Sequence, residues 1–375
     1  MNVFAYIFSD FVLDLSGPKR VSQGIFFLLD KQVKNVIKYF SCKEVAKHSI
    51  IMSQEVCAMK NLNNRKVAIV GDGMVGSSIA YTFLLKSNIQ DIVIIDVNKD
   101  KAEGDALDMN HAMSLLSPKD IKAGTYEDIE DAHIIVITAG AAQKPGETRL
   151  QLCEKNKAIF DSIFALMKPH LNPESIVLIV TNPVDILTHY AYTKLGLPAN
   201  QVIGSGTVLD TARLKFLLSE DTKIDPRNIH TYVIGEHGDS EVMAYSVTYI
   251  AGVPIYDFCA VCGRCKNQYH LKRLEEMGKE VVSSAYKIIE KKGSTYYGIA
   301  SAVARIVDAI VNDTESVLTV SSYVKEALDG KIRDVYLSVP SIVNQHGAIK
   351  TLWPSYSKQE EDQLIASANT LKQFY

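Results

Sequence analysis

The sequence predicts an α/β fold in which a doubly wound parallel sheet is followed by a domain of the α+β class. The first observation is that nearly continuous apolar runs alternate with stretches of helical spacing over residues 66–206. Strands buried on both faces have this composition, because helices cover both sides of a parallel sheet. The second observation is that the strands beyond residue 206 alternate in polarity and are interspersed with long helices. This change of pattern predicts a second, α+β domain.

The first domain is predicted over residues 59–205. KVAIV at 66–70 is a short β-rich run, and MVGSSIAYTFLLKS, which begins four residues later, has helical spacing. The same alternation continues to the end of the domain. The remaining expected strands are residues 91–96, 132–138, 175–180 and 201–206, and the remaining expected helices are residues 99–113, Arg149 to about His170, and a segment from about Val184.

The second domain is predicted over residues 206–375. Its strands alternate in polarity and are interspersed with long helices. The expected strands are residues 230–235, 241–250, 316–324 and 333–343, and the expected helices are residues 268–292, 295–312 and 357–373. The chain shows no internal repeat and no low-complexity linker.

Residues 1–58 differ from the rest of the chain. They mix aromatic runs such as FAYIF with short basic patches, and no period lasts long enough to define an element. They also lack the amphipathic, arginine-rich and acid-poor character of a transit peptide. Because Met59 stands only a few residues before the first strand, we expect either a misassigned start codon or a loosely attached segment with little fixed structure.

Composition excludes several classes of protein. The net charge of −3 and the scattered basic residues give no general attraction to nucleic acid or to an anionic membrane. The six cysteines are too sparse for a secreted disulfide framework, which makes a reducing cytoplasm the expected compartment. No apolar stretch approaches the ~18 uninterrupted residues that a membrane helix needs.

The segment KVAIVGDGMVG carries Gly71, Gly73 and Gly76 at the spacing of a dinucleotide-binding turn. Gly71 allows the tight turn, Gly73 lets the backbone approach a pyrophosphate, and Gly76 permits close helix–strand packing. Asp96 ends the next strand, where a carboxylate accepts from ribose hydroxyls and repels a 2′-phosphate. The alternative is a plain βα turn. The complete strand–turn–helix context predicts a Rossmann-type domain that binds NAD.

Three further stretches place chemical groups near the carboxyl end of this sheet. TAGAAQKPGETRL (138–150) is either a solvated loop or a mobile lid that carries Arg149 over a substrate. Asn182 follows the next strand at the same sheet edge. Asp210 and Arg213 share one helix face, either as a local ion pair or as part of a substrate site.

His237, in YVIGEHGDSE, is either a buried core histidine or a proton donor. An imidazole suits a proton that must come and go near neutral pH. Asp210, if it pairs with the far ring nitrogen, would orient the ring and favour the imidazolium. A planar guanidinium such as that of Arg213 binds a carboxylate bidentately. Together these groups predict a dehydrogenase in which a nicotinamide carries the hydride.

From about Lys66 to Phe374 the chain resembles the bacterial-type L-lactate dehydrogenases of the lactate/malate dehydrogenase superfamily. The motifs that carry the resemblance follow the family's order and spacing: GDGMVGSS, GAAQKPGETRL, TNPVDIL, GSGTVLDTARL, IGEHGDSE and KKGSTYYGIA. Six motifs over some three hundred residues are highly specific. The resemblance implies a homotetramer that interconverts pyruvate and L-lactate with NAD.

The resemblance also implies a role for each matching residue. His237 is the proton donor and acceptor and Asp210 its partner, while Arg149 polarises the pyruvate carbonyl and Arg213 binds the substrate carboxylate. Asn182 and Thr295 line the substrate pocket. Besides the three glycines and Asp96, the implied NAD contacts are Val75, Lys101, Tyr126, Gly140, Ala141, Thr181, Asn182 and Ser205.

Gln143 separates lactate from malate enzymes in this superfamily, because malate enzymes place an arginine there for a second carboxylate. A neutral glutamine leaves that carboxylate unpaired in a desolvating pocket, so the sequence favours pyruvate and lactate. One alternative is a dehydrogenase of the L-2-hydroxyisocaproate type, which accepts bulkier side chains. Another is a catalytically silent protein used for binding or structure, although the intact catalytic set argues against it.

Two further patterns leave alternatives open. CAVCGRC (259–265) followed by His270 has metal-like spacing, but the matching family segment is a variable surface without metal, so we expect none. Relatives bind fructose 1,6-bisphosphate at a subunit interface through an arginine and a histidine. His230 fits the histidine position, whereas Lys215 replaces the arginine and loses its bidentate fork, which makes a response to this effector doubtful.

Overall fold

The structure is a computed structural model that describes residues 62–142, 149–262 and 270–375. These residues belong to one compact unit, Lys60–Tyr375. The expectations for residues 1–58 and for Gln143 lie outside the described residues. So do the side chains of Arg149, Cys259 and His270, together with the whole of Cys265.

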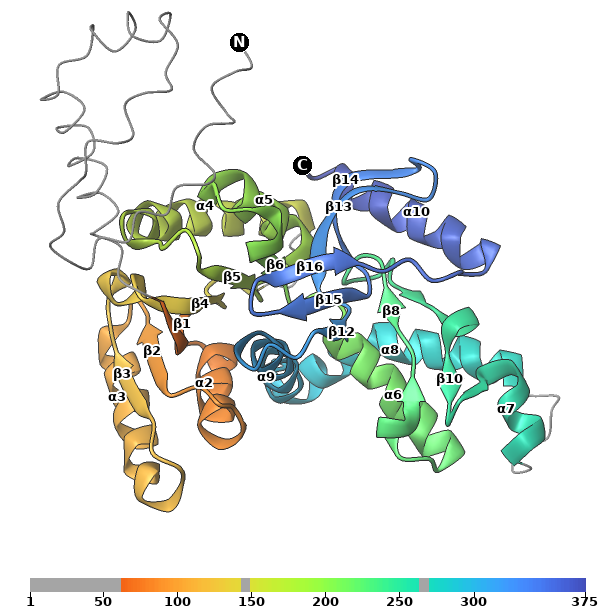
Figure 1. Ribbon diagram of the computed structural model, residues 1–375, viewed down its shortest axis with the longest axis horizontal. Coiled ribbons are helices and arrows are strands. Elements are labelled where there is room, and N and C mark those ends of the chain that lie inside the picture. The colour runs from red at the N-terminus through yellow and green to blue at the C-terminus, as the bar shows by residue number, and fades with distance from the viewer. Residues whose placement is uncertain (1–61, 143–148, 263–269) are drawn as a thin grey trace, which may run out of the picture. The chain divides into compact units, whose positions relative to one another are not determined.

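The largest sheet has eight strands in the order β14-β13-β6-β5-β4-β1-β2-β3 (Figure 1). Six of them are parallel and come from residues 63–204: β1 (Asn63–Val70), β2 (Asp91–Ile95), β3 (Asp120–Ala123), β4 (Ala132–Ile137), β5 (Ile176–Ile179) and β6 (Val202–Gly204). The order 3-2-1-4-5-6 is that of a doubly wound dinucleotide-binding sheet. The predicted fold class is therefore confirmed, and β3 is a strand that the sequence pattern missed.

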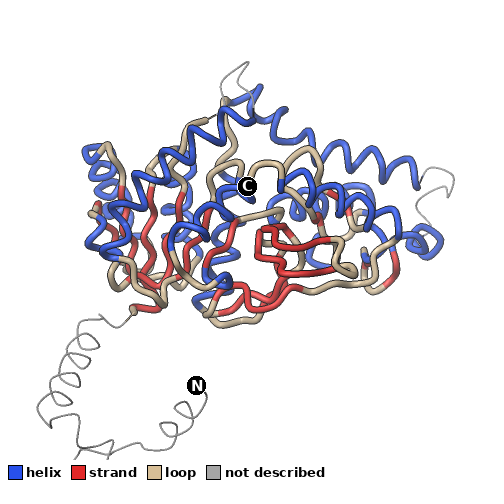
Figure 2. Tube along the Cα trace, turned by 90° about the horizontal axis from the view of Figure 1, so that it is seen from above, coloured by secondary structure: helices blue, strands red, loops and turns tan. Residues whose placement is uncertain are grey.

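Alternate residues of each strand face opposite sides of the sheet. In β1, Val67 and Ile69 pack on one face with α2 (Met74–Lys86) and α3 (Lys99–His111), while Ala68 and Val70 pack on the other. That second face is covered by α4 (Arg149–Met167) and α5 (Val184–Leu195). Figure 2 shows the strands running side by side between helices. Burial on both faces explains why the strands are almost entirely apolar.

The second half of the chain does not stay apart from this sheet. Strands β13 (Ser321–Ala327) and β14 (Ile332–Ser338) extend it antiparallel beyond β6, through pairing of Ser321 with Gly204. Helix α9 (Tyr297–Val311) packs in the same apolar cluster as α2. Local periodicity reveals an apolar face but not its partner, so these contacts with the parallel sheet were not predicted from the sequence.

The remaining elements surround the site described below. The helices are α6 (Val208–Thr222), α7 (Ile255–Cys262), α8 (His270–Lys292) and α10 (Lys358–Lys372). The strands are β7 (Ile229–His230), β8 (Val233–Ile234), β9 (Val242–Met243), β10 (Tyr249–Ile250), β11 (Val253–Pro254), β12 (Ser316–Leu318), β15 (Ser341–Asn344) and β16 (Gly347–Thr351), which form three small sheets.

The single strand predicted over residues 241–250 is wrong, because a short 3-10 helix at Tyr245–Val247 separates β9 from β10. The interruption has a polar cause. The backbone N–H of Ser246 donates to the Glu360 carboxylate at 2.9 Å, and the Ser246 hydroxyl donates to the same carboxylate. Glu360 also completes the capping box of α10 with Ser357. This carboxylate thus takes the backbone donor that a continuous strand would have paired.

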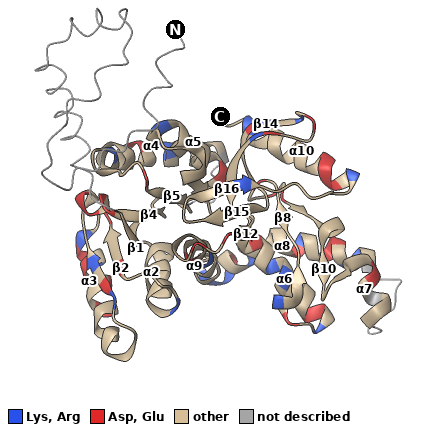
Figure 3. Ribbon diagram, in the orientation of Figure 1, with Lys and Arg blue, Asp and Glu red and all other residues tan. Residues whose placement is uncertain are grey.

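Acidic and basic side chains are interspersed over the helices, for example on α3 and α10 (Figure 3). This distribution agrees with the small net charge. Among the described residues, no helix combines the length and the apolar character that crossing a membrane requires.

Candidate active site

The turn between β1 and α2 has the form that a dinucleotide requires. Gly71 has a φ of +106°, and a Cβ there would lie 2.5 Å from the backbone nitrogen of Ala139. A Cβ on Gly76 would lie 1.9 Å from the carbonyl oxygen of Gly71, whereas a Cβ on Gly73 would meet nothing within 4 Å. Helix α2 begins directly after Gly73 and has no acidic residue in its first turn. Two glycines therefore pack the turn, and the third leaves room for a pyrophosphate at the helix N-terminus.

The carboxylate of Asp96 lies at the end of β2, beside this turn. It accepts the backbone N–H of Asp72 at 2.6 Å and that of Asn98 at 2.8 Å. Tyr126 is nearby, and burial followed by the Asp96 charge raises the pKa of its phenol. The two backbone donors hold Asp96 at the edge where a ribose would lie, so the residues fit NAD.

Asp72, within the glycine-rich turn, is a buried acid that the sequence analysis did not consider. Its side chain is fully buried and its Oδ2 atom lies 2.9 Å from Lys101 Nζ, while Lys101 also contacts Asp105 at 2.6 Å. Burial raises the pKa of Asp72 to about 6, although the bond from Lys101 opposes this shift. In the sequence, the position of Asp72 between two glycines was the only sign of its pairing with Lys101.

The loops that follow β4 and β5 are joined by Asn156, a fully buried residue of α4 that the sequence analysis missed. Its Oδ1 atom accepts the N–H of Ala141 at 2.8 Å, and its Nδ2 group donates to the carbonyl of Asn182 at 2.8 Å. Thr181 donates its hydroxyl to Ala139 O at 2.8 Å. These bonds hold the predicted cofactor loops together at one sheet edge. An amide in the middle of a helix gave no signal of this contact.

The other predicted cofactor residues lie in the first turn of α2 or directly after strands of the parallel sheet. Val75 is half-buried in the first turn of α2, and Gly140 is exposed after β4. Ser205 is buried directly after β6, where its N–H donates to the Ile179 carbonyl at 2.8 Å.

His237 lies in the turn between β8 and β9 and contacts α6. Its Nδ1 atom is 2.6 Å from Asp210 Oδ2, and the other oxygen of Asp210 accepts from Arg213 Nη1 at 2.7 Å. Asp210 and Arg213 stand one helical turn apart, as their spacing predicted. The side chain of Asp210 is buried, whereas that of His237 is 23% exposed. The arrangement leaves Nε2 of His237 free of Asp210, so that it can face a substrate.

A second aspartate, which the sequence did not single out, fixes the backbone of His237. Asp185 of α5 is buried, and its Oδ2 atom accepts the His237 N–H at 2.8 Å. Its Oδ1 atom accepts the hydroxyl of Ser338, on β14, at 3.1 Å. Burial raises the pKa of the Asp185 carboxyl. Residues from three distant parts of the chain therefore position the imidazole.

The charges around His237 favour its protonated form. Burial alone would lower the pKa of the imidazole, but the carboxylate of Asp210, followed by those of Glu241 and Asp185, raises it to about 9. Burial likewise would raise the pKa of Asp210, yet His237 and Arg213 lower it below its ordinary value. At neutral pH the pair is thus an imidazolium and a carboxylate, ready to deliver a proton.

A cavity of about 260 Å³ opens beside this pair. Its polar lining includes Asn182, Asp210, Arg213, His237, Asp239 and Glu241, and its apolar lining includes Leu152, Pro183, Val282, Ala285 and Ile289. Four predicted site residues thus meet in one cavity. Thr295 lies apart from this lining, half-buried in the turn between α8 and α9. Arg149 begins α4.

Glu241 is a further residue of this cavity that the sequence analysis missed. One of its carboxylate oxygens lies within 4.8 Å of side-chain ligand atoms of Asp210 and His237. Its Oε1 atom is buried and has no hydrogen-bond partner within the described part of the chain. Its place in the sequence, four residues after the histidine, was the only signal available.

The two predicted effector residues are in different settings. Lys215 is half-buried in α6, where burial and then the neighbouring Arg305 lower the pKa of its amine. His230 is exposed in β7, opposite Tyr249 of β10.

Comparison with known proteins agrees with this geometry. A family model for the lactate/malate dehydrogenase NAD binding domain matches residues 65–204, and one for the lactate/malate dehydrogenase alpha/beta C-terminal domain matches residues 207–374. An L-lactate dehydrogenase of Thermoanaerobacterium saccharolyticum is 50% identical over 308 residues, which are 82% of this chain and 96% of that protein. L-lactate dehydrogenase 1 of Clostridium acetobutylicum is 48% identical over 313 residues, which are 83% and 97% of the two chains.

A solved structure is also similar to this chain. The minor L-lactate dehydrogenase from Enterococcus mundtii, in a ligands-bound form, has a TM-score of 0.77 and 39% identity. The match covers 83% of this chain and 97% of that one.

Proposed function

Because the chain belongs to the lactate/malate dehydrogenase family, we propose that it is an NAD-dependent L-lactate dehydrogenase. The observation that carries this proposal is the 2.6 Å pairing of His237 with Asp210 in a cavity that also contains Arg213. That cavity is lined by Asn182 and Pro183, which follow β5 of the dinucleotide-binding sheet. A proton donor, a carboxylate-binding cation and the cofactor site therefore converge on one substrate.

Each side chain has a role in the interconversion of pyruvate and L-lactate. A nicotinamide cofactor bound at this site would supply the hydride acceptor for lactate oxidation and the hydride donor for pyruvate reduction. The imidazolium of His237 gives its Nε2 proton to the oxygen of the reduced carbonyl, and neutral His237 takes that proton back in the reverse direction. Arg213 donates one hydrogen bond to Asp210, from Nη1, and binds the substrate carboxylate with its other N–H groups. We assign polarisation of the carbonyl to Arg149.

The proposed NAD site consists of the glycine-rich turn and the loops at the adjoining sheet edge. Gly71, Gly73, Gly76 and Asp96 hold the pyrophosphate and the ribose. The other proposed contacts are Val75, Lys101, Tyr126, Gly140, Ala141, Thr181, Asn182 and Ser205. Gln143, Asn182 and Thr295 complete the substrate pocket in this proposal.

We propose that the enzyme is a cytoplasmic homotetramer. Exposed apolar side chains on α2, namely Met74, Tyr81 and Leu85, support a subunit interface. We further propose that an anion such as fructose 1,6-bisphosphate acts near Lys215 and His230. The proximity of Arg305 to Lys215 supports an anion site. Sedimentation analysis and assays with and without the bisphosphate test these proposals.

The proposed division of the chain is an extension at 1–58, a nucleotide domain at 59–205 and a substrate domain at 206–375. The family model for the nucleotide domain begins at residue 65, and the 50% identical relative is matched over 96% of its own length by 82% of this chain. This supports the idea that residues 1–58 are not needed for folding or catalysis. A chain that starts at Met59 should match the full chain in Tm and kcat. An insoluble or inactive product would refute this.

The decisive experiment for the function is an NADH-absorbance assay with pyruvate, 2-oxoisocaproate and oxaloacetate. We expect pyruvate to have the highest kcat/KM. His237→Gln should lower kcat by about 10²–10⁴-fold and leave NADH affinity unchanged, because only the positioned proton donor is lost. A preference for 2-oxoisocaproate would indicate the bulkier 2-hydroxy acid instead, and no turnover by the full chain would refute the function.

A further inference from the structure

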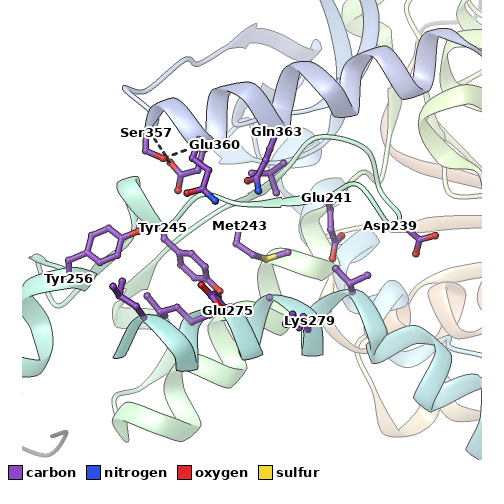
Figure 4. A pocket seen from close by; sticks show the side chains of 16 residues that line it. Asp239, Glu241, Met243, Tyr245, Tyr256, Glu275, Lys279, Ser357, Glu360 and Gln363 are labelled. Atoms are coloured by element: carbon purple, nitrogen blue, oxygen red, sulfur yellow. Dashed lines mark hydrogen bonds between the residues drawn. The ribbon is translucent and has the colours of Figure 1, made fainter. Parts of the chain in front are cut away.

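The turn that carries His237 is held from three sides through consecutive backbone N–H groups. The first, that of Gly235, donates to the carbonyl oxygen of Ser338 in β14 at 2.8 Å. The N–H of the next residue donates to the Ser367 hydroxyl in α10, and that of His237 donates to Asp185 in α5, each at 2.8 Å. Strand β9, which follows the turn, lies between α8 and α10 (Figure 4). The place of the imidazole therefore depends on β14, α10 and α5.

Strand β14 reaches this turn through Ser338, a fully buried residue. Besides accepting from Gly235, Ser338 donates its N–H to the Gly235 carbonyl oxygen at 3.0 Å. Its hydroxyl donates to Oδ1 of Asp185 at 3.1 Å, and the other oxygen of Asp185 accepts the His237 N–H. A displacement of β14 at Ser338 would therefore move both the start of the turn and the carboxylate that fixes His237.

Strand β14 lies at the edge of the eight-stranded sheet, so one of its sides has no neighbouring strand in that sheet. Alternate residues of an extended strand direct their backbone N–H and C=O groups to the same side. On the side away from β13, Ser338 bonds to Gly235, and Tyr336, two residues earlier, bonds to the phenol of Tyr375. The Tyr336 N–H donates to Tyr375 Oη at 2.9 Å, and Oη donates to the Tyr336 carbonyl oxygen at 3.4 Å. The phenol thus takes the place of a strand on the edge that holds the catalytic turn.

The side chain of Tyr375 is itself held by α5 and α4. His189 of α5 stacks on the phenol ring, with ring centroids 3.6 Å apart and 15° between the ring planes. Lys157 of α4 donates to the carbonyl oxygen of Phe374 at 3.2 Å. Burial and, to a smaller extent, the charge of Asp185 raise the pKa of the phenol against the effect of its backbone bond, so the O–H remains a donor. Because His189 lies one helical turn after Asp185, Tyr375 contacts both elements that hold this carboxylate in place.

We propose that Tyr375 is a positioning residue for His237, an inference that rests on the proposed function. Its phenol fixes the outer edge of β14, and the same edge binds the catalytic turn two residues further along. Tyr375 does not line the substrate cavity. It acts through β14 and Asp185 on the place of the imidazole.

Loss of the phenol O–H should leave a buried backbone group unpaired. Tyr375 Oη is the partner of the Tyr336 N–H, and Tyr336 is 0% exposed. An unpaired buried N–H is costly, so we expect this part of β14 to shift toward water. Because Ser338 lies on the same edge, the shift should reach Asp185 and displace His237. A misplacement of about 1 Å can cost roughly 10²-fold in rate.

Tyr375→Phe tests the positioning role, because phenylalanine keeps the stacked ring and removes only the hydroxyl. We expect kcat for pyruvate to fall about 5–30-fold, while NADH affinity in calorimetry stays unchanged. The pH profile of kcat/KM should move as well. Its midpoint reports His237, whose pKa Asp210 raises to about 9 against the effect of burial. A displaced imidazole should lower this midpoint by about 0.5 pH unit or more, whereas a purely structural role would lower Tm and leave the midpoint unchanged.

Two comparisons identify the hydroxyl as the cause. Tyr375→Ala vacates a site that solvent reaches, since Tyr375 is 42% exposed. Added p-cresol, which is the side chain of tyrosine, should restore part of the rate, whereas toluene, the side chain of phenylalanine, should not. Tyr190→Phe is the matched control, because Tyr190 lies next to His189 in α5 and its phenol donates to Asp161 at 2.6 Å, a bond that does not involve β14. Its kcat and pH midpoint should not change.

The results separate this inference from the proposed function. If the unmodified enzyme does not turn over pyruvate, the function is wrong. If it does, and Tyr375→Phe retains either its kcat or its pH midpoint, the positioning role is wrong, and a lower Tm alone would mean that the phenol only stabilises the fold. Equal rescue of Tyr375→Ala by toluene and p-cresol would also overturn the inference, because the ring would then merely fill space.

Discussion

Asp210→Asn removes the charge that contributes most to the protonation of His237. Asp210 is the first of the groups that raise the pKa of the imidazole from 6.5 to about 9, against the effect of burial. Without this carboxylate we expect the pKa of His237 to fall to 6.5 or below, because burial then outweighs the more distant Glu241 and Asp185. The substitution keeps the size of the side chain, so the packing around α6 should persist.

The magnitude follows from this shift. A fall of about 2.5 pKa units corresponds to roughly 3.4 kcal/mol of lost stabilisation of the imidazolium, at 1.36 kcal/mol per unit. At pH 7.5 the protonated fraction of His237 would decrease about tenfold. The loss of pyruvate reduction should thus be about tenfold at pH 7.5 from protonation alone, and it should diminish below pH 6.

The assay is kcat/KM for pyruvate measured between pH 5 and pH 10, which reports groups of the free enzyme. The unmodified enzyme should lose activity as pH rises through about 9, and Asp210→Asn as it rises through 6.5 or lower. The midpoint is the measurement, because Arg213 also loses its partner and the height of the curve will change for that reason. Asp239→Asn, in the same cavity, is the control and should keep the higher midpoint. A midpoint that stays near 9 in Asp210→Asn would refute the electrostatic argument.

Three further predictions concern the glycine-rich turn and Gln143. Gly73→Ala should leave Tm unchanged, since its Cβ meets nothing within 4 Å, but should weaken NADH binding in calorimetry, whereas Gly76→Ala should lower Tm because its Cβ lies 1.9 Å from a carbonyl oxygen. The pKa of Asp72 is 3.8 in the ordinary state and is raised to about 6 in the folded protein. Its contribution to stability is therefore fully present below pH 3.8 and is lost as the pH rises through 6. The Tm of Asp72→Asn minus the Tm of the unmodified protein should therefore be larger at pH 8 than at pH 5. An equal difference at the two pH values would contradict this. Gln143→Arg should shift the kcat/KM ratio from pyruvate toward oxaloacetate, and an unaltered ratio would remove Gln143 from the pocket wall.

The sequence was sufficient for most of the parallel sheet, because its central strands have segments that are buried on both faces and therefore apolar. It missed β3, since a four-residue edge strand with the sequence DIKA has no such run. It also placed one strand over 241–250, where the Glu360 carboxylate interrupts the ladder. Short strands depend on contacts made by distant residues, and a local pattern does not contain these contacts.

The residues of the site were likewise predicted in part and missed in part. The family motifs pointed to His237, Asp210 and Arg213, because these residue types have few roles at such spacing. Asp185 and Asn156 were missed, since they act through backbone groups that lie 52 and 26 positions away. A buried polar residue is recognisable only when the fold shows what it contacts.

The pairing of Ser321 with Gly204 limits how this chain can be divided into fragments that fold. Because β13 and β14 complete the sheet begun by β1–β6, and α9 buries the face that α2 leaves open, neither half encloses a finished core. A gene fragment that ends near residue 205 would expose the edge of β6 and an apolar sheet surface, which are conditions for aggregation. Chimeras between relatives should therefore exchange the nucleotide half together with residues 297–338. Heating should melt residues 62–375 in a single cooperative transition, without a surviving subdomain.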